Sequence, residues 1–130
     1  FFLFLYLGGG MYGKLGHGNE AGHSTPKRVD ALVGLAVSQI ACGSRHTAII
    51  TSSGAIYTWG DKENGVAGHG DTDGHQYTPK LLERLAGKRY VAVSIDTSTP
   101  HLFVGVILVD TDAAVRPVHI SYANNLSLFK

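Results

Sequence analysis

Four of the seven histidines stand in a pattern that could bind a metal ion. His17 and His23 are separated by five residues, and His69 and His75 repeat this spacing. Imidazole nitrogens are common ligands of zinc and related metals, so the duplicated spacing raises the hypothesis of a metal site. A structural zinc site needs four ligands close together, and no cysteine or carboxylate stands at ligand spacing around these histidines. We therefore favour a structural role for them and expect no metal or other cofactor.

A second pattern with chemical potential is the string Gly8 to Gly13, which reads G-x-G-x-x-G and is followed about 20 residues later by Asp30. In a dinucleotide-binding site this string opens a helix whose N-terminus faces the pyrophosphate. The next residues, 14–26, contain several glycines and a proline and show no helical periodicity. The sequence therefore predicts a glycine turn here and no nucleotide site.

The remaining reactive side chains do not form a catalytic group. Cys42 follows an apolar, strand-like segment, so we expect a small buried side chain and not a reactive thiol. His46 precedes a strand, and neither a serine nor a cysteine stands in a recognisable arrangement with it. We expect no catalytic site in this chain.

The positions of the glycines reveal an internal repeat. Gly-Lys-Leu-Gly-His-Gly at 13–18 returns as Gly-Val-Ala-Gly-His-Gly at 65–70, about 52 residues later. After one extra residue, Thr25-Pro26-Lys27 returns as Thr78-Pro79-Lys80. A period near 50 residues is typical of solenoids, propellers and arrays.

Each repeat unit carries signals for short strands. We expect a hairpin over 46–59 turned at Ser53-Gly54, and matching strands over 37–41 and 90–94. The best helical candidate is 79–86, which would end at Gly87 after two turns. The tail from residue 95 has no copy elsewhere, although 102–109 has the composition of a strand.

These elements predict an all-β fold: a fragment of a β-propeller, about two blades of four-stranded antiparallel sheet, with an unmatched C-terminal tail. The expected division has four parts. They are the end of a preceding blade over 1–12, a full repeat over 13–64, a partial second repeat over 65–94, and the off-pattern tail over 95–130.

Composition excludes several classes of function. The 11 basic and 10 acidic side chains give a net charge of +1 without a basic stripe, so we expect no nucleic-acid binding. The apolar run 1–7 is far shorter than the roughly 20 residues that span a bilayer, so we expect no membrane span. A single cysteine excludes an intramolecular disulfide framework and favours a reducing compartment, the cytoplasm or nucleus.

The segments 13–18, 25–27, 40–48 and 54–60, in this order and spacing, resemble the repeat of the regulator of chromosome condensation (RCC) family. The resemblance covers about residues 8–94 and implies a seven-bladed β-propeller. It also implies a structural role for the residues that match the repeat, with His46 hydrogen-bonded to backbone between blades. These repeat positions are Gly13, Gly16, Gly18, Gly43, His46, Gly54, Trp59, Gly60, Gly65, Gly68 and Gly70. The pattern departs from the family at Ile95-Asp96 and at Leu7, which stands where the full copy has Trp59.

Within that family the sequence is most similar to propellers of large ubiquitin ligases that carry a HECT catalytic domain. This resemblance implies a protein-interaction module that binds a ubiquitination substrate. The alternative is a propeller that acts as a guanine-nucleotide exchange factor on a small GTPase.

The expected contacts with such a protein partner are charged residues in loops beside the strand ends, because loops on a rigid scaffold commonly carry binding residues. The other interpretation is that these charges are merely solvated. The residues concerned are Asp61, Lys62, Glu63, Asp71 and Asp73.

Overall fold

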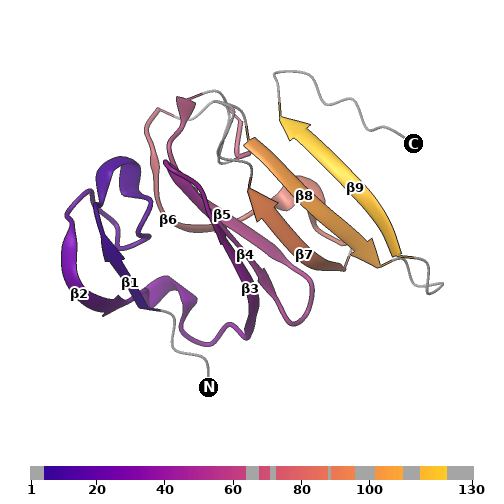
Figure 1. Cartoon of the computed structure of the whole chain (residues 1–130), viewed down its shortest axis with the longest axis horizontal. Coiled ribbons are helices and arrows are strands. Elements are labelled where there is room, and N and C mark those ends of the chain that lie inside the picture. The colour runs from indigo at the N-terminus through magenta and orange to yellow at the C-terminus, as the bar shows by residue number, and fades with distance from the viewer. Residues whose placement is uncertain are drawn as a thin grey trace.

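The structure is a computed structural model, and it shows three antiparallel sheets joined by turns and short 3-10 helices (Figure 1). The residues that it describes are 5–63, 68–70, 73–87, 89–95, 102–109 and 115–122. In this part of the chain no helix is long and apolar enough to cross a membrane.

The central sheet is a four-stranded meander in which consecutive strands pair antiparallel. Its order is β3 (Val37–Cys42), β4 (His46–Thr51), β5 (Ile56–Gly60) and β6 (Gln76–Leu81). β4 is buried along its whole length, in keeping with its β-branched side chains, whereas β3 at the sheet edge is mostly exposed. This arrangement is that of one propeller blade.

The hairpin expected over 46–59 is confirmed. Thr47 lies opposite Trp59 and Ile49 lies opposite Tyr57 in the β4–β5 pair. The turn contains Gly54 with φ of +87°, a left-handed conformation that glycine adopts without steric cost.

The N-terminal sheet contains two strands, β1 (Leu5–Gly8) and β2 (His23–Arg28). The repeat offset places β1 on β5 and β2 on β6, so these strands correspond to the last two strands of the central sheet. The 3-10 helix η1 (Met11–Gly13) lies between them, and η2 (Asp30–Leu32) leads from β2 toward the central sheet.

The third sheet contains β7 (Tyr90–Ile95), β8 (Leu102–Val109) and β9 (Val115–Tyr122). The same offset places β7 on β3, and β7 lies against β3 and β4 of the central sheet. The strand expected over 102–109 is confirmed as β8. The off-pattern tail therefore extends the blade architecture beyond the recognisable repeat.

The core joins the central sheet to the segment that precedes it in the chain. Its buried members are Val29, Leu32, Val37, Ile49 and Trp59. Two of these residues come from the link between β2 and β3, and two come from the β4–β5 hairpin. Burial of apolar surface therefore connects the central sheet to the segment between β2 and β3.

Two expectations are wrong. The helix over 79–86 is replaced by β6, which continues to Leu81, and by the single 3-10 turn η4 (Glu83–Leu85), because Leu81 pairs with Tyr57 in the sheet. Cys42 is exposed, because it ends the edge strand β3 and lies outside the buried hairpin.

Candidate functional site

The glycine loop 13–18 is fastened to the central sheet through the carbonyl oxygen of Lys14. The indole Nε1 of Trp59 and the hydroxyl of Thr47 both donate to this oxygen, each at 2.8 Å. The backbone N–H of Gly18 donates to the carbonyl oxygen of Tyr77 at 3.0 Å. The glycine loop is thus held by β4, β5 and β6 of the central sheet.

Close approach explains why this loop contains glycine. Gly16 has φ of +78°, and a Cβ atom there would lie 2.9 Å from Nε1 of Trp59. Gly13 has φ of +70°, and its Cβ would lie 2.9 Å from Cα of Tyr77. Any other residue at either position would carry both backbone strain and a clash.

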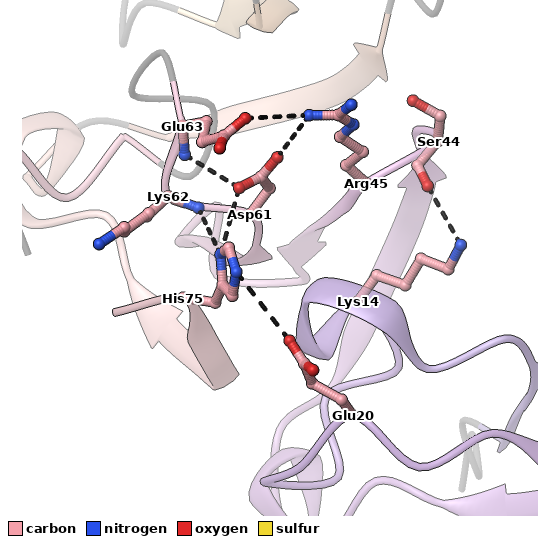
Figure 2. A network of polar contacts seen from close by, with 8 residues as sticks. All are labelled: Lys14, Glu20, Ser44, Arg45, Asp61, Lys62, Glu63 and His75. Carbon is pink, nitrogen blue, oxygen red and sulfur yellow. Dashed lines mark hydrogen bonds and ion pairs between the residues drawn. The ribbon is translucent and has the colours of Figure 1, made fainter. Parts of the chain in front are cut away.

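The buried carboxylate of Asp61 contacts several residues of the charged loops near the glycine loop. The side chain of Asp61 is 1% exposed and its Oδ2 accepts a hydrogen bond from Nη1 of Arg45 at 3.2 Å. Its Oδ1 accepts the backbone N–H of Glu63 at 3.0 Å and lies 3.1 Å from Nδ1 of His75. Figure 2 shows these groups converging on Asp61. This satisfies the requirement that a buried charge be paired and hydrogen-bonded.

Arg45 extends the network to the surface. Its Nη1 also lies 3.2 Å from Oε2 of Glu63, and its guanidinium carbon stands 4.9 Å from the centroid of the Tyr12 ring. The hydrogen bond to Asp61 and the charge on Glu63 help to raise the pKa of Arg45 above its ordinary value. Three contacts therefore fix the orientation of a half-exposed guanidinium.

The N-terminal segment completes the network. The Tyr12 ring packs edge-on against His75, with centroids 5.4 Å apart, and its backbone has a φ of +64° that is uncommon for a residue other than glycine. Oε1 of Glu20 lies 4.0 Å from Nε2 of His75. Nζ of Lys14 donates to the carbonyl oxygen of Ser44 at 3.1 Å. Side chains from the N-terminal segment, such as Lys14 and Glu20, thus contact the central sheet and its loops (Figure 2).

The charged residues expected to face a partner fall into different environments. Lys62, Glu63 and Asp73 are exposed, and Nζ of Lys62 donates to the carbonyl oxygen of Asp73 at 3.5 Å. Asp61 differs from the expectation: its side chain is buried, where it contacts Arg45 and His75, and it does not reach the surface. Asp71 lies outside the described residues.

The two histidine pairs have different surroundings. The His17 and His23 rings are in edge contact with centroids 4.9 Å apart. His69 instead places Nε2 2.9 Å from the hydroxyl of Thr58, and burial lowers its pKa. His75 belongs to the Asp61 network. In the part of the chain that the structure describes, no group of three or more histidine, cysteine, aspartate or glutamate side chains could hold a metal ion.

His46 is buried, with 5% of its surface exposed, and burial lowers its pKa to about 4. The hydrogen bond to backbone implied by the family resemblance is absent at Nε2, which has no partner among the described residues. His46 begins β4 and lies opposite Gly60 of β5.

The other repeat positions lie in turns and at strand ends. The N–H of Gly43 donates to the carbonyl oxygen of His46 at 2.8 Å and closes the β3–β4 turn. Positive φ is found at Gly18, Gly54, Gly60, Gly68 and Gly70. Gly65 lies outside the described residues. The string Gly8 to Gly13 ends in η1, a single 3-10 turn, and the chain then enters the glycine loop.

Sequence reasoning missed the contributions of Tyr12, Glu20, Arg45 and His75 to this network. One signal was available: Arg45 is the charged residue within the repeat-like segment 40–48. What the network offers chemically is recognition, since its described contacts are ion pairs, hydrogen bonds and ring contacts that hold charged groups at a surface.

Comparison with known sequences identifies relatives along the repeat region. The chain is 41% identical over 87 residues to the human E3 ubiquitin-protein ligase HERC2, a match covering 67% of the chain and 2% of that protein. It is 38% identical over 87 residues to the ultraviolet-B receptor UVR8 of Arabidopsis thaliana, covering 67% and 20%. It is 46% identical over 67 residues to the probable E3 ubiquitin-protein ligase HERC4 of Rattus norvegicus, covering 51% and 6%.

Solved structures share the fold. Human WBSCR16 superposes with a TM-score of 0.66 at 19% identity, covering 89% of this chain and 32% of that one. Yeast RCC1 (Prp20), solved in complex with Kap60, gives a TM-score of 0.60 at 16% identity, covering 89% and 33%. These likenesses confirm the predicted antiparallel propeller architecture.

The chain spans between 2% and 20% of the length of these curated relatives. The family model described as the regulator of chromosome condensation (RCC1) repeat matches residues 5–50 and 53–95, and a second RCC1 repeat model matches 37–66. Those matches cover the glycine loop, the central sheet and β7, where the sequence resemblance placed the repeats. The chain is a member of the RCC1 repeat family.

Proposed function

We propose that this chain is part of a protein-interaction propeller from a large HECT-type ubiquitin ligase of the cytoplasm or nucleus, where it binds a ubiquitination substrate. The observation that supports this most strongly is the 41% identity to the ligase HERC2 over 87 residues. The match to HERC4, another protein named as a probable ubiquitin ligase, points the same way.

The loop network suits this role. Among the described residues, the Asp61 carboxylate accepts the backbone N–H of Glu63, and Nζ of Lys62 donates to the carbonyl oxygen of Asp73, so these contacts restrain the exposed residues Lys62, Glu63 and Asp73. Preorganised loops lose less conformational entropy when a partner binds. In this proposal the buried Asp61 side chain holds the loop in place, and the exposed residues contact the partner.

Ubiquitin transfer itself would take place elsewhere in the parent protein. The proposed contribution of this chain is substrate choice, since binding alone can bring a substrate close to a distant catalytic domain.

A guanine-nucleotide exchange factor for a small GTPase is the second candidate. The specific support is the fold likeness to yeast Prp20p, whose solved structure is described together with its binding to Gsp1p and histones. That likeness is at 15% identity, so it supports the fold more than the activity.

The proposal is tested in the parent protein with the charge reversals Lys62→Glu and Asp73→Lys. Their exposed side chains can be reversed without touching the buried Asp61. We expect ubiquitination of at least one substrate to fall about tenfold, as the loss of one well-placed contact of about 1.4 kcal/mol predicts. Loading of ubiquitin on the HECT cysteine should be unchanged.

The matched control is Lys27→Glu on β2, an exposed charge reversal outside the charged loops. Quantitative proteomics of ubiquitinated peptides compares the three variants with the wild type. An unchanged substrate profile in both loop variants would contradict the proposal, and so would an equal loss in the control.

A further inference from the structure

Nδ1 of His75 has two neighbours that require opposite protonation states. It lies 3.1 Å from Oδ1 of Asp61 and 3.1 Å from the backbone nitrogen of Lys62. The N–H of Lys62 can donate only to an Nδ1 atom that carries no proton, whereas the Asp61 carboxylate can accept only from an Nδ1 atom that carries one. Each protonation state therefore satisfies one contact and opposes the other.

A second carboxylate lies near the opposite edge of the His75 ring and favours its charged form. Oε1 of Glu20 lies 4.0 Å from Nε2, so a doubly protonated His75 would stand between two carboxylates, from Glu20 and Asp61. Glu20 lies between β1 (Leu5–Gly8) and β2 (His23–Arg28), in the segment 5–28 that we call the N-terminal unit, whereas Asp61 follows β5 of the central sheet. The imidazolium would therefore join the two units through an ion pair on each edge of its ring.

The other groups around the ring do not oppose this bridge strongly. The rings of Tyr12 and Tyr77 contact His75 edge-on, with centroids 5.4 and 6.1 Å away. Lys62 contacts the ring through its backbone, and its Nζ is directed to the carbonyl oxygen of Asp73. Nη1 of Arg45 contacts Oδ2 of Asp61, whereas the oxygen of Asp61 that faces His75 is Oδ1.

We propose that His75 is a pH-sensitive latch between the N-terminal unit and the loop that begins at Asp61. In mildly acidic solution His75 bridges Glu20 and Asp61 and releases the N–H of Lys62. In mildly alkaline solution Nδ1 accepts that N–H and the bridge opens. This inference concerns the fold and does not depend on the partner.

The test is a nuclear magnetic resonance titration of the full chain, labelled with nitrogen-15, between pH 8 and pH 5. We expect the Lys62 amide resonance to move with the same midpoint as the ring nitrogens of His75, and exchange of this amide with solvent to become faster in acid than the pH dependence of intrinsic exchange predicts. In His75→Gln, which cannot change charge, both responses should disappear.

Glu20→Gln provides an independent variant that keeps the histidine. It removes one carboxylate from the bridge, so the shared midpoint should move to lower pH while the Lys62 amide still follows His75. Independence of the Lys62 amide from the His75 titration in the wild type would overturn the proposal. An unmoved midpoint in Glu20→Gln would overturn the bridge to the N-terminal unit.

Discussion

The indole nitrogen of Trp59 donates a hydrogen bond to the carbonyl oxygen of Lys14, 2.8 Å away and 45 residues earlier in the chain. Trp59 is fully buried in the central sheet, and Lys14 lies in the glycine loop 13–18. This bond fastens the glycine loop to the core of the central sheet.

The first prediction concerns the two donors to Lys14. Trp59→Phe and Thr47→Val should each lower the free energy of unfolding by about 1 kcal/mol from the lost hydrogen bond, with a further loss of packing for the indole. The double variant leaves the carbonyl oxygen without either donor, so the combined loss should exceed the sum of the single losses. Urea unfolding of the four proteins measures this coupling, and strict additivity would contradict the shared-acceptor geometry.

The second prediction concerns the glycine that faces the indole. Gly16→Ala combines a left-handed φ of +78° with a Cβ atom 2.9 Å from Nε1 of Trp59. Gly34→Ala is the matched control, because its φ of +87° is similar but its Cβ would meet nothing within 4 Å. We expect a loss of about 1 kcal/mol for Gly34→Ala and about 1–3 kcal/mol more for Gly16→Ala. Equal losses in thermal unfolding would show that the contact with Trp59 has no effect.

The third prediction concerns the buried carboxylate. Asp61→Asn removes the negative charge that Arg45 contacts, and it replaces one carboxylate oxygen with an NH2 group that cannot accept a hydrogen bond. The free energy of unfolding should therefore fall by about 1–3 kcal/mol. Asp30→Asn breaks the exposed pair between Arg28 and Asp30, whose side chains are 56% and 76% exposed, and should cost less than about 1 kcal/mol. Chemical denaturation at fixed ionic strength compares the two, and a smaller effect at Asp61 would contradict its organising role.

The fourth prediction follows from the buried His46. Its folded-state pKa of about 4 lies below the ordinary value of 6.5, so between these values the unfolded chain binds more protons than the folded chain. The stabilisation is therefore present above about pH 6.5 and is lost as the pH falls toward 4, by an amount on the order of 3 kcal/mol. Burial lowers the pKa of His69 in the same direction, which adds to the slope.

Unfolding free energy measured from pH 7 to pH 4 tests this dependence. His46→Gln removes the ionisable group, so its stability should vary less with pH than that of the wild type. An identical slope in the variant would assign the acid sensitivity to other groups.

Much of the fold could be predicted from local signals in the sequence. The β4–β5 hairpin could be predicted because its β-branched residues and the Ser53-Gly54 turn are adjacent in the chain. β7 could be predicted because it repeats β3, and β8 because its own composition is strand-like. β9 was not predicted, since its sequence has no copy in the chain and its pairing with β8 depends on the rest of the sheet.

The site was less accessible to sequence reasoning, because its contacts are long-range. Tyr12 contacts Arg45 and His75, which are more than 30 and more than 60 residues away in the chain. Asp61 is one residue before the exposed Lys62, yet it is buried, and sequence alone gave both the same loop environment. Burial of a single carboxylate depends on the positions of its distant partners, here Arg45 and His75.

Sequencing the full-length transcript that encodes this chain decides whether it belongs to the propeller of a HECT-type ubiquitin ligase. We expect further units of about 50 residues on both sides and a HECT domain downstream in the same reading frame. A complete reading frame that contains RCC1 repeats but no HECT domain would contradict the ligase assignment and favour the exchange-factor alternative.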